Sequence, residues 1–228
     1  MPRWLNIAAS CVFLLICYEL SAHEVNPQDI EALRGQTGAT SWALAVFLGA
    51  KHMVTGIDHV LFLVGVMFLL SKRSEILWFA TLFALGHTIT LLAGALFGFG
   101  LNHYITDFVI GFSVVYKGLD NLRSLDGKPS LTATKPTVFV FGLIHGLGLA
   151  SRVDAMSIPS DNLVLTVLSF NLGVELGQII ALTAVLLILW QWQKAAHFKQ
   201  HAVIANTLLV TAGFTLMIYQ AVGFWLSY

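Results

Sequence analysis

The sequence predicts an all-α membrane protein in which a bundle of six transmembrane helices follows a cleavable signal peptide. Of its 228 residues, 57% are hydrophobic and only 11% are charged, whereas a soluble domain carries about 25% charged residues. So few charged side chains could not keep so apolar a chain in water, and we expect lipid to cover much of its surface. The net charge of zero leaves no basic surface, so nucleic acid is not an expected partner.

The first 22 residues have the features of a secretory signal peptide. Arg3 precedes an apolar run from Ile7 to Ile16, and Leu20-Ser21-Ala22 is a suitable cleavage site. Cleavage there would make His23 the new N-terminus, whose amine and ring nitrogen could both bind metal. Residues 23–41 would then form a short periplasmic segment ahead of a transmembrane domain, 42–228. The alternative is an uncleaved first transmembrane helix.

Six further segments are apolar over about 20 residues, the length a helix needs to cross the hydrocarbon core. In order, they are 42–70, 76–98, 103–122, 136–152, 162–190 and 203–226. Polar stretches separate them: Ser71–Glu75, Asn102–His103, Arg123–Lys135, Arg152–Asp161 and Gln191–His201. The first and fifth segments are longer than a span requires and the fourth is short. Gly56 is expected to kink the first helix.

Positive charges predict how the bundle is oriented. Eight lysines and arginines, Lys117 among them, fall in the connections after the first, third and fifth spans, against three on the other side. Because cytoplasmic loops are enriched in cations, we expect a multi-pass protein of the bacterial inner membrane with both mature termini in the periplasm. Asp120 and Asn121, at the cytoplasmic end of the third span, are expected to form a solvated helix cap.

Several ionisable side chains lie inside these spans, where they are costly and usually functional or paired. A rise of about 1.5 Å per residue puts His59, His87 and His145 roughly 13 to 16 Å above the cytoplasmic ends of their spans. That is near the middle of a core about 30 Å thick, and Glu175 falls near the middle of the fifth span. His52, seven residues before His59, shares its face of a continuous helix. We expect these side chains to converge on one pocket.

Imidazole nitrogens and carboxylate oxygens together suit divalent transition metals. The predicted metal ligands are His52, Asp58, His59, His87, His145 and Glu175. Asn171 and Gln178 lie on one helical face with Glu175. Together with Thr88, they are the predicted hydrogen-bonding partners that hold the ligands in position. The alternative is that all these polar residues only join packed helices.

Four strings in the sequence resemble motifs of the HupE/UreJ family, in its second subgroup. They are His52-x5-Asp58-His59 followed by Leu61-Phe62-Leu63, Gly86-His87-Thr88, His145-Gly146-Leu147-Gly148, and Phe170-Asn171-x-Gly173-x-Glu175-x-Gly177-Gln178. The resemblance covers roughly residues 42–180. It implies a bacterial membrane protein, accessory to nickel hydrogenases and ureases and acting as a nickel or cobalt permease. It also implies a set of metal ligands: His52, Asp58, His59, His145 and Glu175.

The sequence departs from this family in one motif. The nickel-permease branch carries a second histidine and a glutamate soon after the first histidine of the fourth helix. Here that place reads Gly148-Leu149-Ala150-Ser151. The resemblance therefore implies a divalent metal without fixing nickel as its identity.

Two classes of function follow. The preferred one is a permease that moves a divalent transition metal toward the cytoplasm, with nickel first and cobalt, zinc, iron and copper left open. Its partners would be the lipid bilayer, the metal ion and maturation proteins of nickel enzymes. The alternative is an intramembrane metalloenzyme or a metal-binding accessory protein for hydrogenase or urease. An enzyme is less favoured because the sequence lacks the dense histidine clusters of membrane di-iron hydroxylases, and no phosphate-binding loop points to ATP as an energy source.

Overall fold

The computed structural model describes residues 39–68, 73–98, 101–128, 134–153 and 163–227. Within these ranges the chain forms seven helices and no strand, so the all-α prediction is confirmed. The helices are α3 (Ala39–Thr55), α4 (Ile57–Met67), α5 (Arg73–Phe97), α6 (His103–Leu125), α7 (Thr134–Val153), α8 (Leu163–Gln193) and α9 (Phe198–Leu226). The predicted signal peptide, His23 and the predicted periplasmic segment up to residue 38 lie outside the described residues.

Three helices in the described part of the chain are long and apolar enough to cross a membrane. They are Trp78–Phe97 within α5, the whole of α8 and the whole of α9. The bent pair α3–α4 is a fourth if it forms one span, and Lys135–Ala150 within α7 is a shorter apolar helix. These helices are those of a membrane protein. Each of the six expected segments overlaps a helix, but the count of six spans stays a prediction.

The first expected span is broken into two helices at Gly56. The axes on either side of the break differ by 64°, so the expected kink is confirmed, and His52 and His59 do not lie on the face of one continuous helix. Gly56 takes an extended conformation, with φ of −69° and ψ of 103°. Its N–H still donates to the carbonyl oxygen of His52, and its carbonyl accepts from the N–H of Val60. The bend therefore leaves none of these backbone groups unsatisfied.

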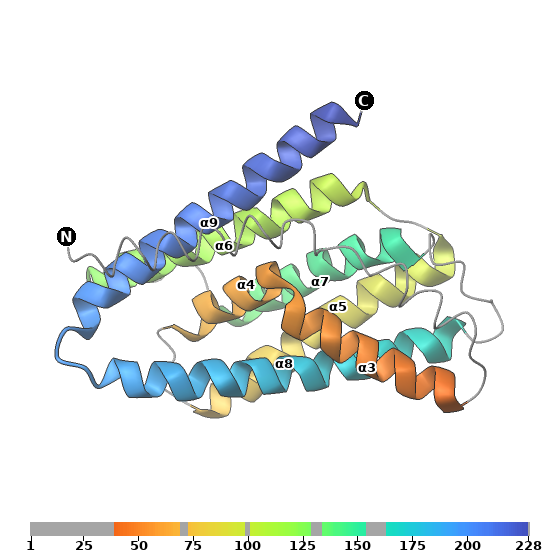
Figure 1. The fold of residues 1–228 in the computed structure, drawn as a ribbon, viewed down its shortest axis with the longest axis horizontal. Helices are drawn as coiled ribbons and strands as arrows, with labels where there is room; N and C mark the ends of the chain where they lie inside the picture. Colours follow the sequence, from red (N-terminus) through yellow and green to blue (C-terminus); the bar gives the residue numbers. More distant parts are fainter. Residues whose placement is uncertain (1–38, 69–72, 99–100, 129–133, 154–162, 228) are drawn as a thin grey trace.

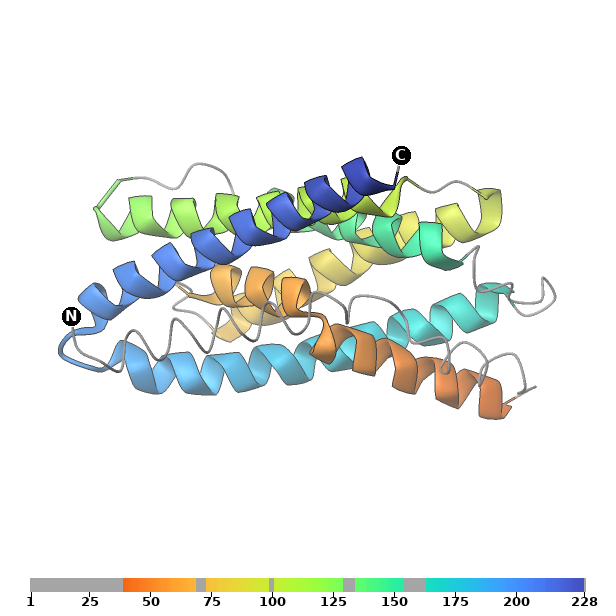
Figure 2. The same cartoon turned by 45° about the horizontal axis from the view of Figure 1, so that its top comes forward.

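The helices pack as three pairs, α3 with α8, α5 with α7 and α6 with α9, and the short helix α4 contacts α3, α6, α8 and α9. Figures 1 and 2 show the α6–α9 pair along one side of the bundle and the α3–α8 pair along the other, with α4 between them. Gly173 faces Val46 and Gly177 faces Ala50, so α3 and α8 run in the same direction. Glycine contacts in the other two pairs show in the same way that α5 runs parallel to α7 and that α6 runs antiparallel to α9.

Glycine sets the spacing within these pairs. A Cβ atom on Gly173 would overlap the carbonyl oxygen of Val46, and one on Gly142 would overlap the carbonyl oxygen of Phe83. In a membrane, where lipid is as apolar as the helices, such close backbone approach is a main source of helix association. The α3–α8 and α5–α7 pairs therefore depend on positions that admit no larger residue.

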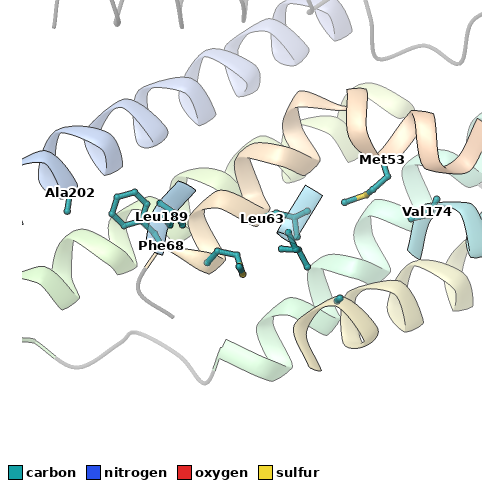
Figure 3. Packing of buried hydrophobic residues seen from close by; sticks show 9 residues of the cluster. Met53, Leu63, Phe68, Val174, Leu189 and Ala202 are labelled. Carbon is teal, nitrogen blue, oxygen red and sulfur yellow. The ribbon is translucent and has the colours of Figure 1, made fainter. Parts of the chain in front are cut away.

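The α4 helix lies at the centre of the apolar core. Leu63 and Phe68 on or next to α4 are buried with Met53 of α3 and Val174 of α8 (Figure 3). The same cluster extends along α8 and α9 through Leu189 and Ala202, which are also labelled in Figure 3. Because α4 is held from several sides, a side chain on it, such as His59, has a fixed position in the middle of the bundle.

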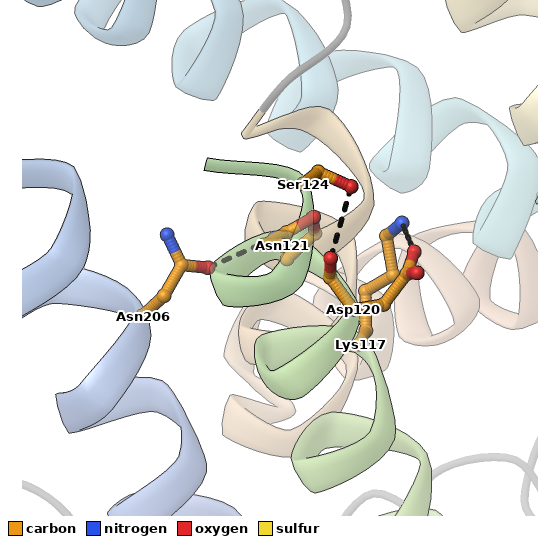
Figure 4. Close-up of polar contacts among 6 residues, drawn as sticks. Lys117, Asp120, Asn121, Ser124 and Asn206 are labelled. Carbon is orange, nitrogen blue, oxygen red and sulfur yellow. Dashed lines mark hydrogen bonds and ion pairs between the residues drawn. The ribbon is translucent and has the colours of Figure 1, made fainter. Parts of the chain in front are cut away.

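The C-terminal end of α6 is buried, which corrects the expectation of a solvated cap. Asp120 is 3% exposed and Asn121 is 1% exposed. Lys117, expected in a cytoplasmic connection, is also buried, and its Nζ lies 2.8 Å from Oδ2 of Asp120 (Figure 4). These residues share the face of α6 that packs on α4 and α9, so their charges are compensated inside the protein.

Asn121 joins three helices through its side-chain amide. Its Nδ2 donates to the carbonyl oxygen of Gly65 on α4 at 2.7 Å and to Oδ1 of Asn206 on α9 at 2.9 Å (Figure 4). Asn206 in turn donates to the carbonyl oxygen of Ala202 at 2.8 Å. Oδ1 of Asn121 has no hydrogen-bond partner among the described residues, so its two donated hydrogen bonds alone hold the buried amide in place.

Candidate metal-binding site

Three imidazole rings from three helices stand in a row. The ring centroids of His52 on α3 and His59 on α4 are 5.2 Å apart, and those of His59 and His145 on α7 are 4.9 Å apart. His59 and His145 are 3% and 2% exposed, whereas His52 is half-buried. The row therefore leads from a partly accessible ring to two rings inside the bundle. His52 and His59 meet across the break at Gly56, not along one helix face.

A phenylalanine lies at the inner end of this row. Phe83 on α5 is fully buried, and its ring contacts His59, His87 and His145 at centroid distances of 6.4, 6.3 and 4.9 Å. The His87 ring is stacked on it, with 18° between the ring planes. Phe83 was not among the predicted site residues, because one more phenylalanine in an apolar span carries no signal except its spacing of four residues from His87. Phe83 thus packs against three imidazoles, His59, His87 and His145.

In two of these imidazoles, the hydrogen bonds define which ring nitrogen carries the hydrogen. Nδ1 of His145 is 2.7 Å from the carbonyl oxygen of Phe141, which can only accept, so Nδ1 carries the hydrogen. Nδ1 of His87 is 3.0 Å from Oδ1 of Asn171. Asn171 points this oxygen at the ring because its own Nδ2 donates to the carbonyl oxygen of Val167 at 3.1 Å. In the neutral rings, the lone pair is therefore on Nε2.

This arrangement resembles that of histidines in metal sites, where the second ring nitrogen donates to a carbonyl or carboxylate and so orients the ring. Nε2 of His87 is buried and makes no hydrogen bond to any residue that the structure describes. A buried nitrogen with an unused lone pair is costly unless water or an ion reaches it. The rings of His87 and His145 are thus oriented as ligands would be.

The other predicted site residues lie in different surroundings. Glu175 is half-buried on α8, and among the described residues it makes no hydrogen bond or ion pair. Asp58 belongs to the first turn of α4, and its side chain lies outside the described part of the structure. The hydroxyl of Thr88 donates to the carbonyl oxygen of Ala84 in its own helix at 2.8 Å.

Thr90, which was not among the predicted site residues, joins α5 to α7 instead. Its hydroxyl is 2.7 Å from the carbonyl oxygen of Leu143, two residues before His145 in the chain. A Cβ atom on Gly146 would overlap Oγ1 of Thr90. The threonine thus fixes the position of α7 along the axis of α5, and with it the relative position of His145 and His87.

Gln178 lies two helical turns beyond Asn171 on α8. Its side chain is fully buried, and neither Nε2 nor Oε1 has a hydrogen-bond partner among the described residues. Two turns correspond to about 10 Å along the helix. Gln178 is therefore a separate polar point on α8, between the buried apolar residues Val174 and Leu182.

The histidines are gathered as contacting pairs and not as one coordination shell. Among the side chains that the structure describes, which leave out Asp58, no three His, Cys, Asp or Glu residues come close enough to hold one metal ion together. The arrangement of described residues offers imidazole pairs in series. Chemically, such pairs favour weak and successive coordination of a borderline cation over a closed cage.

Comparison with models of protein families identifies a related family. A family model described as "HupE / UreJ protein" matches residues 28–228, which is nearly the whole chain and includes all seven described helices. Comparison with curated proteins and with solved structures gives no match.

Proposed function

This chain belongs to the HupE/UreJ family, and we propose that it is a permease that moves a divalent transition metal, nickel first, across the membrane toward the cytoplasm. The family is associated with nickel and cobalt, either in transport or in an accessory function. The observation that carries the proposal is the row of imidazoles at His52, His59 and His145, which comes from three helices. Asp58, His87 and Glu175 complete the proposed set of ligands.

The arrangement of the row supports transport over tight binding. A cation that enters a membrane must exchange its water for protein ligands, and it must also leave again, so several weak sites serve conduction better than one cage. His52 is half-buried and would receive the ion, and His59 and His145 would take it into the bundle. Gln178, whose amide has no described partner, would be the next polar group along α8.

The proposed orientation follows from charge. With the lysines of the α8–α9 connection in the cytoplasm, the mature termini lie in the periplasm of a bacterial inner membrane. Transport would then deliver metal to cytoplasmic maturation proteins of nickel enzymes. Nickel is placed first because of the family, while Gly148, Leu149 and Ala150 stand where its nickel branch carries a second histidine and a glutamate. These three residues are buried and have no side-chain atom that can bind a metal. The ligands must therefore come from other residues.

Metal flux into proteoliposomes tests the proposal. Purified protein is reconstituted around a metal-sensitive dye, and Ni²⁺, Co²⁺, Zn²⁺, Cu²⁺ and Fe²⁺ are added outside in turn. We expect uptake well above that of protein-free liposomes, fastest for Ni²⁺. Background uptake for all five metals would refute a permease. A metal that stays bound through purification in chelator, without any flux, would instead indicate the intramembrane metalloenzyme.

Replacing Asn171 by leucine should weaken metal binding. The change removes the acceptor for Nδ1 of His87, so the ring loses its fixed orientation. Loss of such a partner typically costs 10- to 100-fold in metal affinity. We expect the metal concentration that gives half-maximal uptake into proteoliposomes to rise by about that factor.

Asn206→Leu is the matched control for this variant. Asn206 is also buried and also donates to the carbonyl oxygen four residues before it, but it lies on α9 and bonds Asn121 instead of a histidine. Equal shifts in half-saturation for the two variants would show that Asn171 acts only through helix packing.

A further inference from the structure

An apolar groove runs between α4, α8 and α9, away from the imidazoles. It encloses about 320 Å³ and is lined by hydrophobic side chains, among them Leu61, Val185, Ile188, Leu208 and Ala212. The groove is open on one side. In a membrane protein such a groove faces hydrocarbon, so its occupant must be apolar along this length.

The groove, together with the turn of α9 between it and His201, matches one half of a bilayer in length. Along α9 it reaches from Ala212 to Ala205, and the helix continues to His201 near the α8–α9 turn. The eleven residue-to-residue steps from His201 to Ala212 span about 16 Å at the helical rise. Half of a hydrocarbon core of about 30 Å is nearly the same distance. One acyl chain could therefore lie along the groove with its polar end at the turn.

The end of the groove at the α8–α9 turn is aromatic. Trp192 lines the groove, and its ring contacts Phe68 and Phe198 at centroid distances of 5.6 and 5.8 Å. Its Nε1 donates to Nδ1 of His201 at 3.4 Å. Tryptophan is enriched where the hydrocarbon core meets the polar headgroups. The contacts thus place the headgroup level at this turn.

The turn itself is positively charged and has no acid close to it in the chain. Lys194, His197 and Lys199 are exposed, and Nζ of Lys194 lies 3.9 Å from the ring centroid of Trp190. From residue 176 to residue 228 the sequence contains no aspartate or glutamate. Lysines at this level attract anionic headgroups, so the charge next to the groove suits a phosphate.

From this combination we propose that the groove is a binding site for an anionic phospholipid. One acyl chain lies between α4, α8 and α9, and the phosphate is held by Lys194 and Lys199. A second copy of this chain is a poorer occupant, since a twofold contact would bring a second cationic turn against the first. The apolar segment from Ile7 to Ile16 is poorer for the same reason, because it is preceded by Arg3. The inference does not depend on the proposed transport.

Native mass spectrometry of the full chain in detergent tests the site. Phosphatidylglycerol and phosphatidylcholine with the same acyl chains are the probes. We expect retention of phosphatidylglycerol over phosphatidylcholine, and loss of that preference in a Lys194→Gln, Lys199→Gln variant. At about a fivefold effect per lysine near a membrane surface, the two changes together should weaken phosphatidylglycerol binding about 30-fold at low salt.

The matched control removes two cations from another connection. Lys128→Gln, Lys135→Gln changes one exposed lysine that follows α6 and one in the first turn of α7, and it should leave the preference unchanged. Ala205→Trp fills the groove and should reduce binding of both lipids, with thermal stability measured to verify folding. Equal retention of the two lipids by the unaltered protein, or equal effects of the two lysine pairs, would overturn the proposal. A lipid-free dimer that Ala205→Trp dissociates would overturn it in favour of a second copy.

Discussion

Replacing His59 and His145 together by alanine is expected to reduce metal uptake at least 100-fold. These two rings are in contact at 4.9 Å and are 3% and 2% exposed. Without them, His52 and His87 are left on different helices with no imidazole between them. A divalent ion would then have to enter an apolar bundle without replacement for its water, which is prohibitive. The initial rate of Ni²⁺ uptake into proteoliposomes measures the effect.

Two further variants separate chemistry from folding. His59→Phe, His145→Phe keeps aromatic rings against Phe83 but removes the nitrogens, and it should be as inactive as the alanine variant while staying folded. His197→Ala, His201→Ala removes the same number of imidazoles from the α8–α9 turn and should retain uptake. If the phenylalanine variant transported metal at more than half the normal rate, the imidazoles would have no part in permeation.

The helices were predictable because each depends on a local property of the sequence. A run of about 20 apolar residues can hardly form anything but a helix in a membrane, and Gly56 in the first run marks the break. Depth alone predicted that His59, His87 and His145 lie near one another; all three rings contact Phe83, but no three described residues of the types that bind metal form one coordination shell. What the depth argument could not give is the partner of each ring, since Asn171 is 84 residues from His87.

The polar face of α6 could not be predicted from local pattern. Lys117 and Asp120 near the end of a span look like solvated residues, because charge and position are all that the local sequence offers. Their burial depends on α9, which starts more than 70 residues later and brings Asn206 to Asn121. A pairing between distant helices decides which face of α6 is inside, and no periodicity within α6 encodes that pairing.

The close approach of α3 and α8 is also a long-range feature, and it supports the largest expected effect on stability. Gly173→Ala places a Cβ atom onto the carbonyl oxygen of Val46. Because the contact is with backbone, no side-chain rotation relieves it, and the two helices must separate. Overpacking of a core typically costs 1 to 3 kcal/mol and occasionally more, so we expect a loss of about 3 kcal/mol or more here. The midpoint of thermal unfolding in detergent measures it.

The same substitution should also impair uptake in whatever protein remains folded. The ring centroid of Phe170 on α8 lies 5.9 Å from that of His52, and Asn171 orients His87, so displacement of α8 from α3 disturbs both His52 at one end of the row and His87 beside it. Leu172→Ala is the control, because Leu172 is the neighbouring residue on the lipid-facing side and is 52% exposed. That variant should be nearly as stable and as active as the unaltered protein. A Gly173→Ala protein with unchanged midpoint and unchanged uptake would mean that α3 and α8 do not pack through this glycine.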